Sequence, residues 1–198
     1  MRLGIWVQWR AAAVVLALTA LAAGGCRRPA AATAAPPRLS ASTQPAIVGG
    51  GNFRSEPLNV ELTYPSGWVA KKSPDFVWMA VPTTGSPAAD SLSLDVPSLP
   101  VHLPGMIPIS LVKNGYLDDL KKDKTSFTAK ESSPTVPSAK ARLVQSTWSE
   151  QGQSKFETAL LLVHGDRVYI VRADGLSVDE PRIATAFDEV SRSLRWLK

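Results

Sequence analysis

The chain has 198 residues, of which 44% are hydrophobic and 20% are charged, and a formal net charge of +5. Its single cysteine, Cys26, excludes an internal disulfide, so the folded part must be stabilised by its core alone. The positive charge does not predict nucleic-acid binding, because its excess lies in the first 56 residues. Residues 57–198 carry 16 Lys and Arg against 16 Asp and Glu.

The first 25 residues have the layout of a secretory signal peptide. Two basic residues, Arg2 and Arg10, precede an apolar run over residues 11–23, and two glycines follow it. The apolar run is shorter than the roughly 20 residues that a membrane-spanning helix needs. We therefore expect residues 1–25 to be a signal peptide and not a membrane span.

The end of this segment is similar to the lipobox of bacterial lipoproteins, in which small residues precede a cysteine. The resemblance implies cleavage before Cys26 and attachment of a lipid with acyl chains such as palmitate to its sulfur. The chain departs from the motif at Ala23, where leucine is usual. The alternative is ordinary secretion with cleavage after Ala22, which would leave Cys26 as a free thiol. Arg27 stands where an aspartate would retain an enteric lipoprotein at the inner membrane, which favours the outer membrane.

Residues 26–56 are predicted to be the lipidated cysteine and a flexible tether. The segment is rich in Ala, Pro, Ser and Thr and contains three consecutive glycines at 49–51. It offers too little apolar surface to offset the entropy of ordering the chain. We expect its removal to leave the stability of the following domain, residues 57–198, unchanged.

Three strands are predicted before the first helix of this domain. Apolar and polar residues alternate over 58–63, which is the period of a half-buried strand. The segment YPSGW at 64–68 predicts a tight turn, because Pro65 presets the backbone and Gly67 suits the end of the turn. Apolar strands are predicted at 76–81 and 92–96.

Apolar residues then recur at intervals of three and four over 109–120, which predicts an amphipathic helix. Four strands are predicted after it, at 127–131, 139–149, 156–163 and 167–173. The last two form a hairpin with Gly165-Asp166 at its tip. Both hairpin strands are apolar on both faces and are therefore expected at the centre of the sheet.

A second helix is predicted to close the chain. Pro181 suits its first turn, and Ser177 and Glu180 are spaced as a capping box. Its apolar stripe consists of Ile183, Ala186, Phe187, Val190, Leu194 and Leu197. Phe187 is expected to pack against one face of the central hairpin, formed either by Leu160, Leu162, Val168 and Ile170 or by Leu161, Val163, Tyr169 and Val171.

These elements predict an α+β fold with an antiparallel sheet of about six to seven strands flanked by two main helices. The order of elements, the YPSGW turn, the late hairpin through Tyr169 and the closing Ser193-Leu194-Arg195-Trp196 resemble the PsbP-like family. The resemblance covers about residues 57–196 and implies an α/β/α sandwich. It implies no reaction, because members of this group mostly bind or assist larger assemblies.

Few residues of the chain indicate catalysis. His164 precedes the hairpin tip and His102 lies in an extended stretch between prolines, where polar surface residues are common. A G-x-S-x-G motif is absent, although a hydrolase site assembled from distant residues is not excluded by sequence. Trp68 and Trp78 are expected in the core, and for Trp148 exposure and burial under a helix stay open.

Metal ligands are equally few. Asp174, Asp179 and Glu180 are close in sequence and could bind calcium, but their spacing is not that of an EF-hand. Asp179 and Glu180 also suit the N-terminus of the closing helix. No catalytic, cofactor or metal residue is predicted, and Cys26 is the one predicted site residue.

The sequence therefore predicts a lipid-anchored, exported envelope protein that acts as a non-catalytic binding or assembly module. It contacts the membrane through its N-terminal lipid and is expected to have a protein partner in the envelope and no nucleic-acid partner. The alternatives are a protein that binds a small ligand or divalent cation and a hydrolase with a site assembled in space.

Overall fold

The computed structural model describes residues 50–85, 89–98, 107–122 and 124–197. The predicted signal peptide, Cys26 and His102 lie outside these residues. Within them, neither helix combines the length and the apolar character needed to cross a membrane.

The main sheet has seven strands in the order β3-β4-β5-β9-β8-β7-β6, and every neighbouring pair is antiparallel. The hairpin strands β8 and β9 lie at its centre, as their two apolar faces predict. The α+β class and the strand number are therefore confirmed. The strands are β3 (Trp68–Lys71), β4 (Trp78–Pro82), β5 (Ser91–Asp95), β6 (Thr125–Ser132), β7 (Lys140–Glu150), β8 (Gln153–His164) and β9 (Arg167–Leu176).

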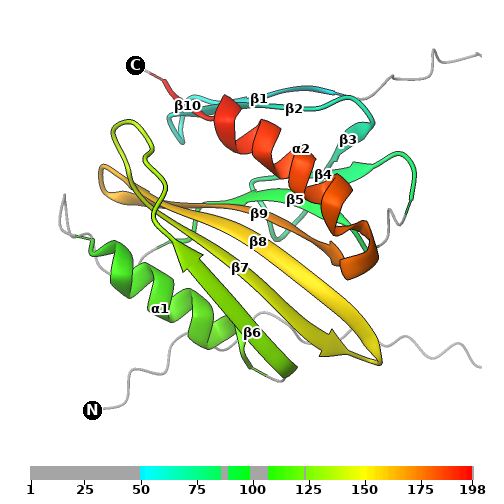
Figure 1. Cartoon of the computed structure of the whole chain (residues 1–198). Coiled ribbons are helices and arrows are strands. Elements are labelled where there is room, and N and C mark those ends of the chain that lie inside the picture. Colours follow the sequence, from blue (N-terminus) through cyan, green and yellow to red (C-terminus); the bar gives the residue numbers. More distant parts are fainter. Residues whose placement is uncertain (1–49, 86–88, 99–106, 123, 198) are drawn as a thin grey trace, which may run out of the picture. The chain divides into compact units, whose positions relative to one another are not determined.

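The two helices cover opposite faces of this sheet, as Figure 1 shows. Helix α1 (Ile109–Leu120) packs on β8 and β7, and helix α2 (Glu180–Ser193) packs on β9, β8 and β5. Two apolar cores result, one under each helix. Trp68 and Trp78 are buried in the core under α2, as expected.

A second, small sheet was not predicted. Its order is β1-β2-β10, formed by β1 (Gly51–Ser55), β2 (Val60–Tyr64) and β10 (Arg195–Trp196). It packs on α2 through β2. The YPSGW turn leads from β2 into β3 and hence from one sheet to the other, with Gly67 at φ +81°. This value lies in the left-handed region that favours glycine.

Strand β1 corrects the predicted boundary of the tether, because Gly51–Ser55 belongs to the domain. The strand pairs with β2 along its whole length, and Phe53 packs on the core under α2. Only Phe53 marks it as apolar, and most of its residues are exposed, so an edge strand of this kind carries a weak sequence signal.

The hairpin register corrects the two faces predicted for Phe187. Directly opposed residues of an antiparallel pair share a face, and the two-residue tip pairs His164 with Arg167. Leu162 therefore lies opposite Tyr169, and Leu160 lies opposite Val171. The core under α2 contains these four residues and Phe187, whereas Leu161, Val163, Val168 and Ile170 lie under α1.

The capping box predicted for α2 is absent. Ser177–Asp179 forms a 3-10 turn, and Asp179 is the N-cap residue without a capping hydrogen bond from its side chain. The Asp179 carboxylate instead lies 3.5 Å from the guanidinium of Arg182, and the Ser177 hydroxyl contacts the Ser154 hydroxyl. Pro181 stands in the first turn of the helix, as predicted.

Removing β1 should lower the stability of the domain, because the pairing with β2 and the packing of Phe53 are lost. We expect a chain that begins at Pro57 to melt several degrees below one that begins at Ile47, since about 1 kcal/mol corresponds to roughly 3–5 °C at this size. Thermal unfolding followed by circular dichroism measures the difference. Coincident melting curves would show that β1 contributes nothing to the fold.

Candidate functional site

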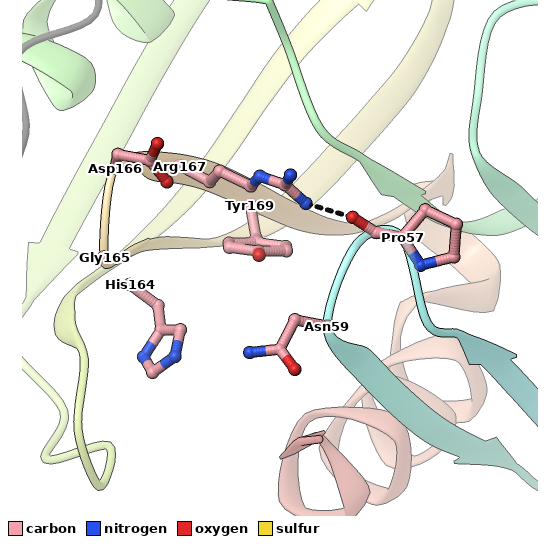
Figure 2. Close-up of a pocket in the computed structure, with 7 residues that line it drawn as sticks. All are labelled: Pro57, Asn59, His164, Gly165, Asp166, Arg167 and Tyr169. Atoms are coloured by element: carbon pink, nitrogen blue, oxygen red, sulfur yellow. Dashed lines mark hydrogen bonds between the residues drawn. The ribbon is translucent and has the colours of Figure 1, made fainter. Parts of the chain in front are cut away.

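A hollow of about 270 Å³ opens at the tip of the β8–β9 hairpin (Figure 2). Its walls come from two places far apart in sequence. The β1–β2 turn supplies Pro57 and Asn59, and the hairpin supplies residues 164–167 and Tyr169. We call it the hairpin-tip pocket. A second hollow, lined by residues 153–154 and 176–178, lies at the other end of the hairpin and carries no charged side chain.

Three hydrogen bonds fix the β1–β2 turn against the rest of the domain. Arg167 Nη1 donates to the carbonyl of Pro57, and the Tyr169 hydroxyl donates to the carbonyl of Leu58 at 2.8 Å. The amide of Leu197 donates to the carbonyl of Asn59 at 3.1 Å. Three successive carbonyls are thus held by donors from β9 and the C-terminal segment, so the pocket has a rigid wall.

Asn59 adopts a left-handed backbone conformation with φ +56°, which asparagine tolerates better than most residues. This conformation directs its side chain into the pocket. Figure 2 shows the Asn59 amide and the His164 imidazole pointing toward each other across the open space. The amide side chain of Asn59 has no hydrogen-bond partner among the described residues.

His164 is held by two contacts that leave one of its nitrogens available. Its Nδ1 lies 2.7 Å from the carbonyl of Ser138, so Nδ1 carries the proton and donates it. Its ring stacks on Trp196 with 4.0 Å between centroids and 2° between planes. Nε2 therefore faces the pocket without a partner among the described residues. The hydrolase hypothesis requires a serine hydroxyl and a carboxylate at this imidazole. The contacts of His164 are instead a main-chain carbonyl and an indole, so they do not form the expected triad.

A second polar cluster lies on the other side of the domain, on the sheet face covered by α1. Ser91 on β5, Asp174 on β9 and Glu157 on β8 stand directly opposite one another in the register. The Ser91 hydroxyl donates to Asp174 Oδ1 at 2.6 Å, and the Tyr116 hydroxyl, from α1, donates to Glu157 Oε1. We call Ser91, Asp174, Glu157 and Tyr116 the acidic cluster.

The acidic cluster holds two carboxyl groups directly opposite each other, with Glu157 buried and Asp174 half-buried. Burial raises the pKa of Asp174 to about 6, and the neighbouring Glu157 adds to the effect while the Ser91 hydroxyl opposes it. Burial and Glu157 also hold the pKa of Tyr116 well above its usual range. The Arg172 guanidinium, whose charge opposes these shifts, is directed to Asp95 at 3.4 Å and stacks on Phe76. Asp174 therefore changes charge nearer to neutral pH than an ordinary aspartate does.

The calcium hypothesis placed Asp174 with Asp179 and Glu180, and the structure does not bring these three together. Asp174 lies on the α1 face, Asp179 pairs with Arg182, and Glu180 is exposed on α2. Within the described part of the chain, no group of three or more His, Cys, Asp or Glu side chains is placed to hold a metal ion.

The question left open for Trp148 is answered by its burial. The side chain is 7% exposed on the α1 face of β7, and the ammonium of Lys124 lies 3.6 Å from the ring centroid. This cation–π contact covers the indole. Trp148 is therefore a packed residue and not part of an open binding surface.

Comparisons with known proteins identify the fold alone. No family model matches the chain, and no curated protein matches it. The solution structure of cyanobacterial PsbP (CyanoP) from Synechocystis sp. PCC 6803 superposes with a TM-score of 0.56 at 12% identity, covering 80% of this chain and 98% of that one. The crystal structure of LpqN, described as involved in cell envelope biogenesis of Mycobacterium tuberculosis, superposes with a TM-score of 0.55 at 16% identity, covering 75% and 86%. The PsbP-like fold implied by the sequence is thus confirmed.

Proposed function

We propose that the chain is a lipid-anchored envelope protein that acts as a binding or assembly module, with the hairpin-tip pocket as its binding surface. The observation that carries the proposal is the rigid pocket itself, in which the Asn59 amide and His164 Nε2 have no partner among the described residues. Small-molecule and peptide sites have this character, a concave surface with a few convergent polar groups.

The place of action is supported by two independent features. The first is the signal-like segment that ends at Cys26. The second is the fold, which the chain shares with LpqN, a protein described as involved in cell envelope biogenesis. In this proposal Cys26 carries the lipid, residues 27–49 bridge the membrane and the domain, and the domain faces the periplasm or the exterior.

A binding role is favoured over hydrolysis by the state of His164. A general base in a nucleophilic triad needs one nitrogen on the nucleophile and the other on an orienting carboxylate. Here Nδ1 is bound to the Ser138 carbonyl and the ring is stacked on Trp196. These contacts orient the imidazole as a recognition group at the wall of the pocket.

Lipidation at Cys26 is tested by the intact mass of the protein purified from the membrane fraction of its host. We expect a chain that begins at Cys26 and carries the added mass of diacylglycerol and an acyl group. The Cys26→Ser variant is expected to lack this added mass. No chain that begins at residue 26 should be found in its membrane fraction. A soluble, unmodified chain that begins at Ala23 would contradict the proposal.

A further inference from the structure

The hairpin-tip pocket has a chemical preference that the geometry of its polar groups reveals. Its polar lining residues are Asn59, His164, Asp166, Arg167 and Tyr169, and Figure 2 shows the Asn59 amide and the His164 imidazole on one side of the Tyr169 ring and the Asp166 and Arg167 side chains on the other. We propose that the pocket binds a single carboxylate group, held between the Asn59 amide and His164 Nε2. This inference rests on the proposed function, because it names the ligand class of the same pocket.

The two principal groups are held in place before a ligand arrives. Asn59 belongs to a turn whose carbonyls are fixed by Arg167, Tyr169 and Leu197. The His164 ring is fixed by its bond to Ser138 and by its stacking on Trp196. Binding therefore immobilises few additional side chains, which favours affinity for a small group.

The charge of the pocket favours a monoanion over a dianion. Asp166 and Arg167 are adjacent and carry opposite charges, so their sum is zero. The Arg167 guanidinium already donates to the carbonyl of Pro57. Its main contribution to a bound anion is therefore its positive charge and not an additional hydrogen bond. A phosphate dianion would bring a second negative charge beside the Asp166 carboxylate without a second fixed cation, whereas a carboxylate is matched by the Asn59 amide and a protonated His164 imidazole.

Carboxylate binding should require a protonated imidazole. With Nδ1–H donated to Ser138, the Nε2 of a neutral ring is an acceptor and repels a carboxylate oxygen. Protonation turns Nε2 into a donor, so binding takes up a proton and weakens as the pH rises. The other charged or titratable groups that line the pocket are Asp166, Arg167 and Tyr169, and the remaining contacts of the ring, the Ser138 carbonyl and Trp196, carry no charge.

The test is a titration of the full chain, purified in detergent, with sodium acetate and with sodium chloride at matched ionic strength. The chain has two histidines, so isotope-labelled histidine gives a simple imidazole spectrum in which His164 can be followed. We expect a saturable shift of the His164 signal with acetate and none with chloride. The apparent affinity should fall as the pH rises, because binding takes up a proton.

Two variants test whether the response arises in the pocket. Asn59→Gly keeps the left-handed backbone at this position and removes the amide. His164→Asn keeps a donor near the place of Nδ1 and removes Nε2. Both are expected to abolish the saturable response, and the folded state of each is checked by its melting curve. Because His164→Asn lacks the imidazole that reports binding, this variant is prepared with isotope-labelled asparagine, and binding is followed through the asparagine signals.

The source of the carboxylate is distinguished by a short alanine peptide with a free C-terminus and the same peptide with an amidated one. Tighter binding of the free peptide than of acetate would assign the pocket to a chain terminus, and equal binding would assign it to a small acid. The inference would be overturned by a linear response to acetate, by an unchanged response in Asn59→Gly, by tighter binding of inorganic phosphate, or by equal binding of the amidated peptide. Lipidation is measured by mass and does not depend on acetate, so the inference and the membrane attachment can fail separately.

Discussion

Replacing Asp174 with asparagine is expected to stabilise the domain at neutral and alkaline pH. The ionised carboxylate is half-buried beside Glu157, and the asparagine amide has no charge but can still accept from Ser91 and donate to Glu157. Because burial raises the pKa of Asp174 from 3.8 to about 6, the gain in the free energy of unfolding at about pH 7.5 should approach 3 kcal/mol.

The direction of the pH dependence follows from the same shift. The folded state binds a proton more tightly than the unfolded state, so the stabilisation by this proton is complete below about pH 4. It is lost as the pH rises through about 6. The wild-type chain should therefore lose stability relative to Asp174→Asn between these values, and the two should be similar below them.

Urea unfolding of both chains at intervals from about pH 4 to about pH 8 measures this difference. Asp118→Asn is the matched control, because Asp118 is exposed on α1 and lies outside the acidic cluster. Its stability should follow that of the wild type at every pH. Parallel curves for the wild type and Asp174→Asn would show that the Asp174 proton does not contribute to stability.

Phe187→Ala is expected to remove a large part of the stability of the domain. Phe187 is 4% exposed and lies in the core between α2 and the hairpin residues Leu160, Leu162, Tyr169 and Val171. Truncation of a buried phenylalanine to alanine typically costs about 3–5 kcal/mol, out of a domain stability of about 5–15 kcal/mol. The midpoint of urea unfolding measures this loss.

The control for this truncation lies on the same helix. Arg192 is 80% exposed and pairs with Asp188, which is also exposed, so Arg192→Ala should change the stability by less than about 0.5 kcal/mol. Phe187→Leu keeps an apolar side chain and should cost clearly less than Phe187→Ala, which keeps the comparison informative if the alanine variant does not fold. Equal midpoints of urea unfolding for Phe187→Ala and Arg192→Ala would show that α2 is not docked on the hairpin.

The elements with strong periodicity were predicted from the sequence, α1 to the residue and the two hairpin strands to within three residues at their ends. Helix α1 begins and ends at the predicted residues, because its apolar residues recur with the helical period, Pro108 stands directly before it, and Lys121 and Lys122 follow it. The β8–β9 hairpin was predicted from its apolar strands and its Gly165-Asp166 tip. Strand β1 was missed, because it has one apolar side chain and becomes a strand only through pairing with β2.

Neither polar site was predicted from the sequence, because the residues of each site come from segments that are far apart in the chain. The hairpin-tip pocket joins Asn59 to His164 through a turn that is fixed by three hydrogen bonds from two other segments, β9 and the C-terminal residues. No local pattern encodes such an arrangement. The acidic cluster had a readable signal, because counting outward from the two-residue tip places Glu157 opposite Asp174. The same count would have placed Leu162 opposite Tyr169 and corrected the two predicted faces of the hairpin.

The claim that the domain is a binding module of the envelope is tested most directly by a photo-crosslinking amino acid placed at Asp166 in the full chain in its host. Asp166 is exposed at the rim of the hairpin-tip pocket, and Lys130, exposed on β6, is the control position. We predict one discrete crosslinked species from position 166, absent when Asn59→Gly is combined with it and absent from position 130. The account would be contradicted by a chain that crosslinks to nothing at position 166, or that gives the same species from positions 166 and 130.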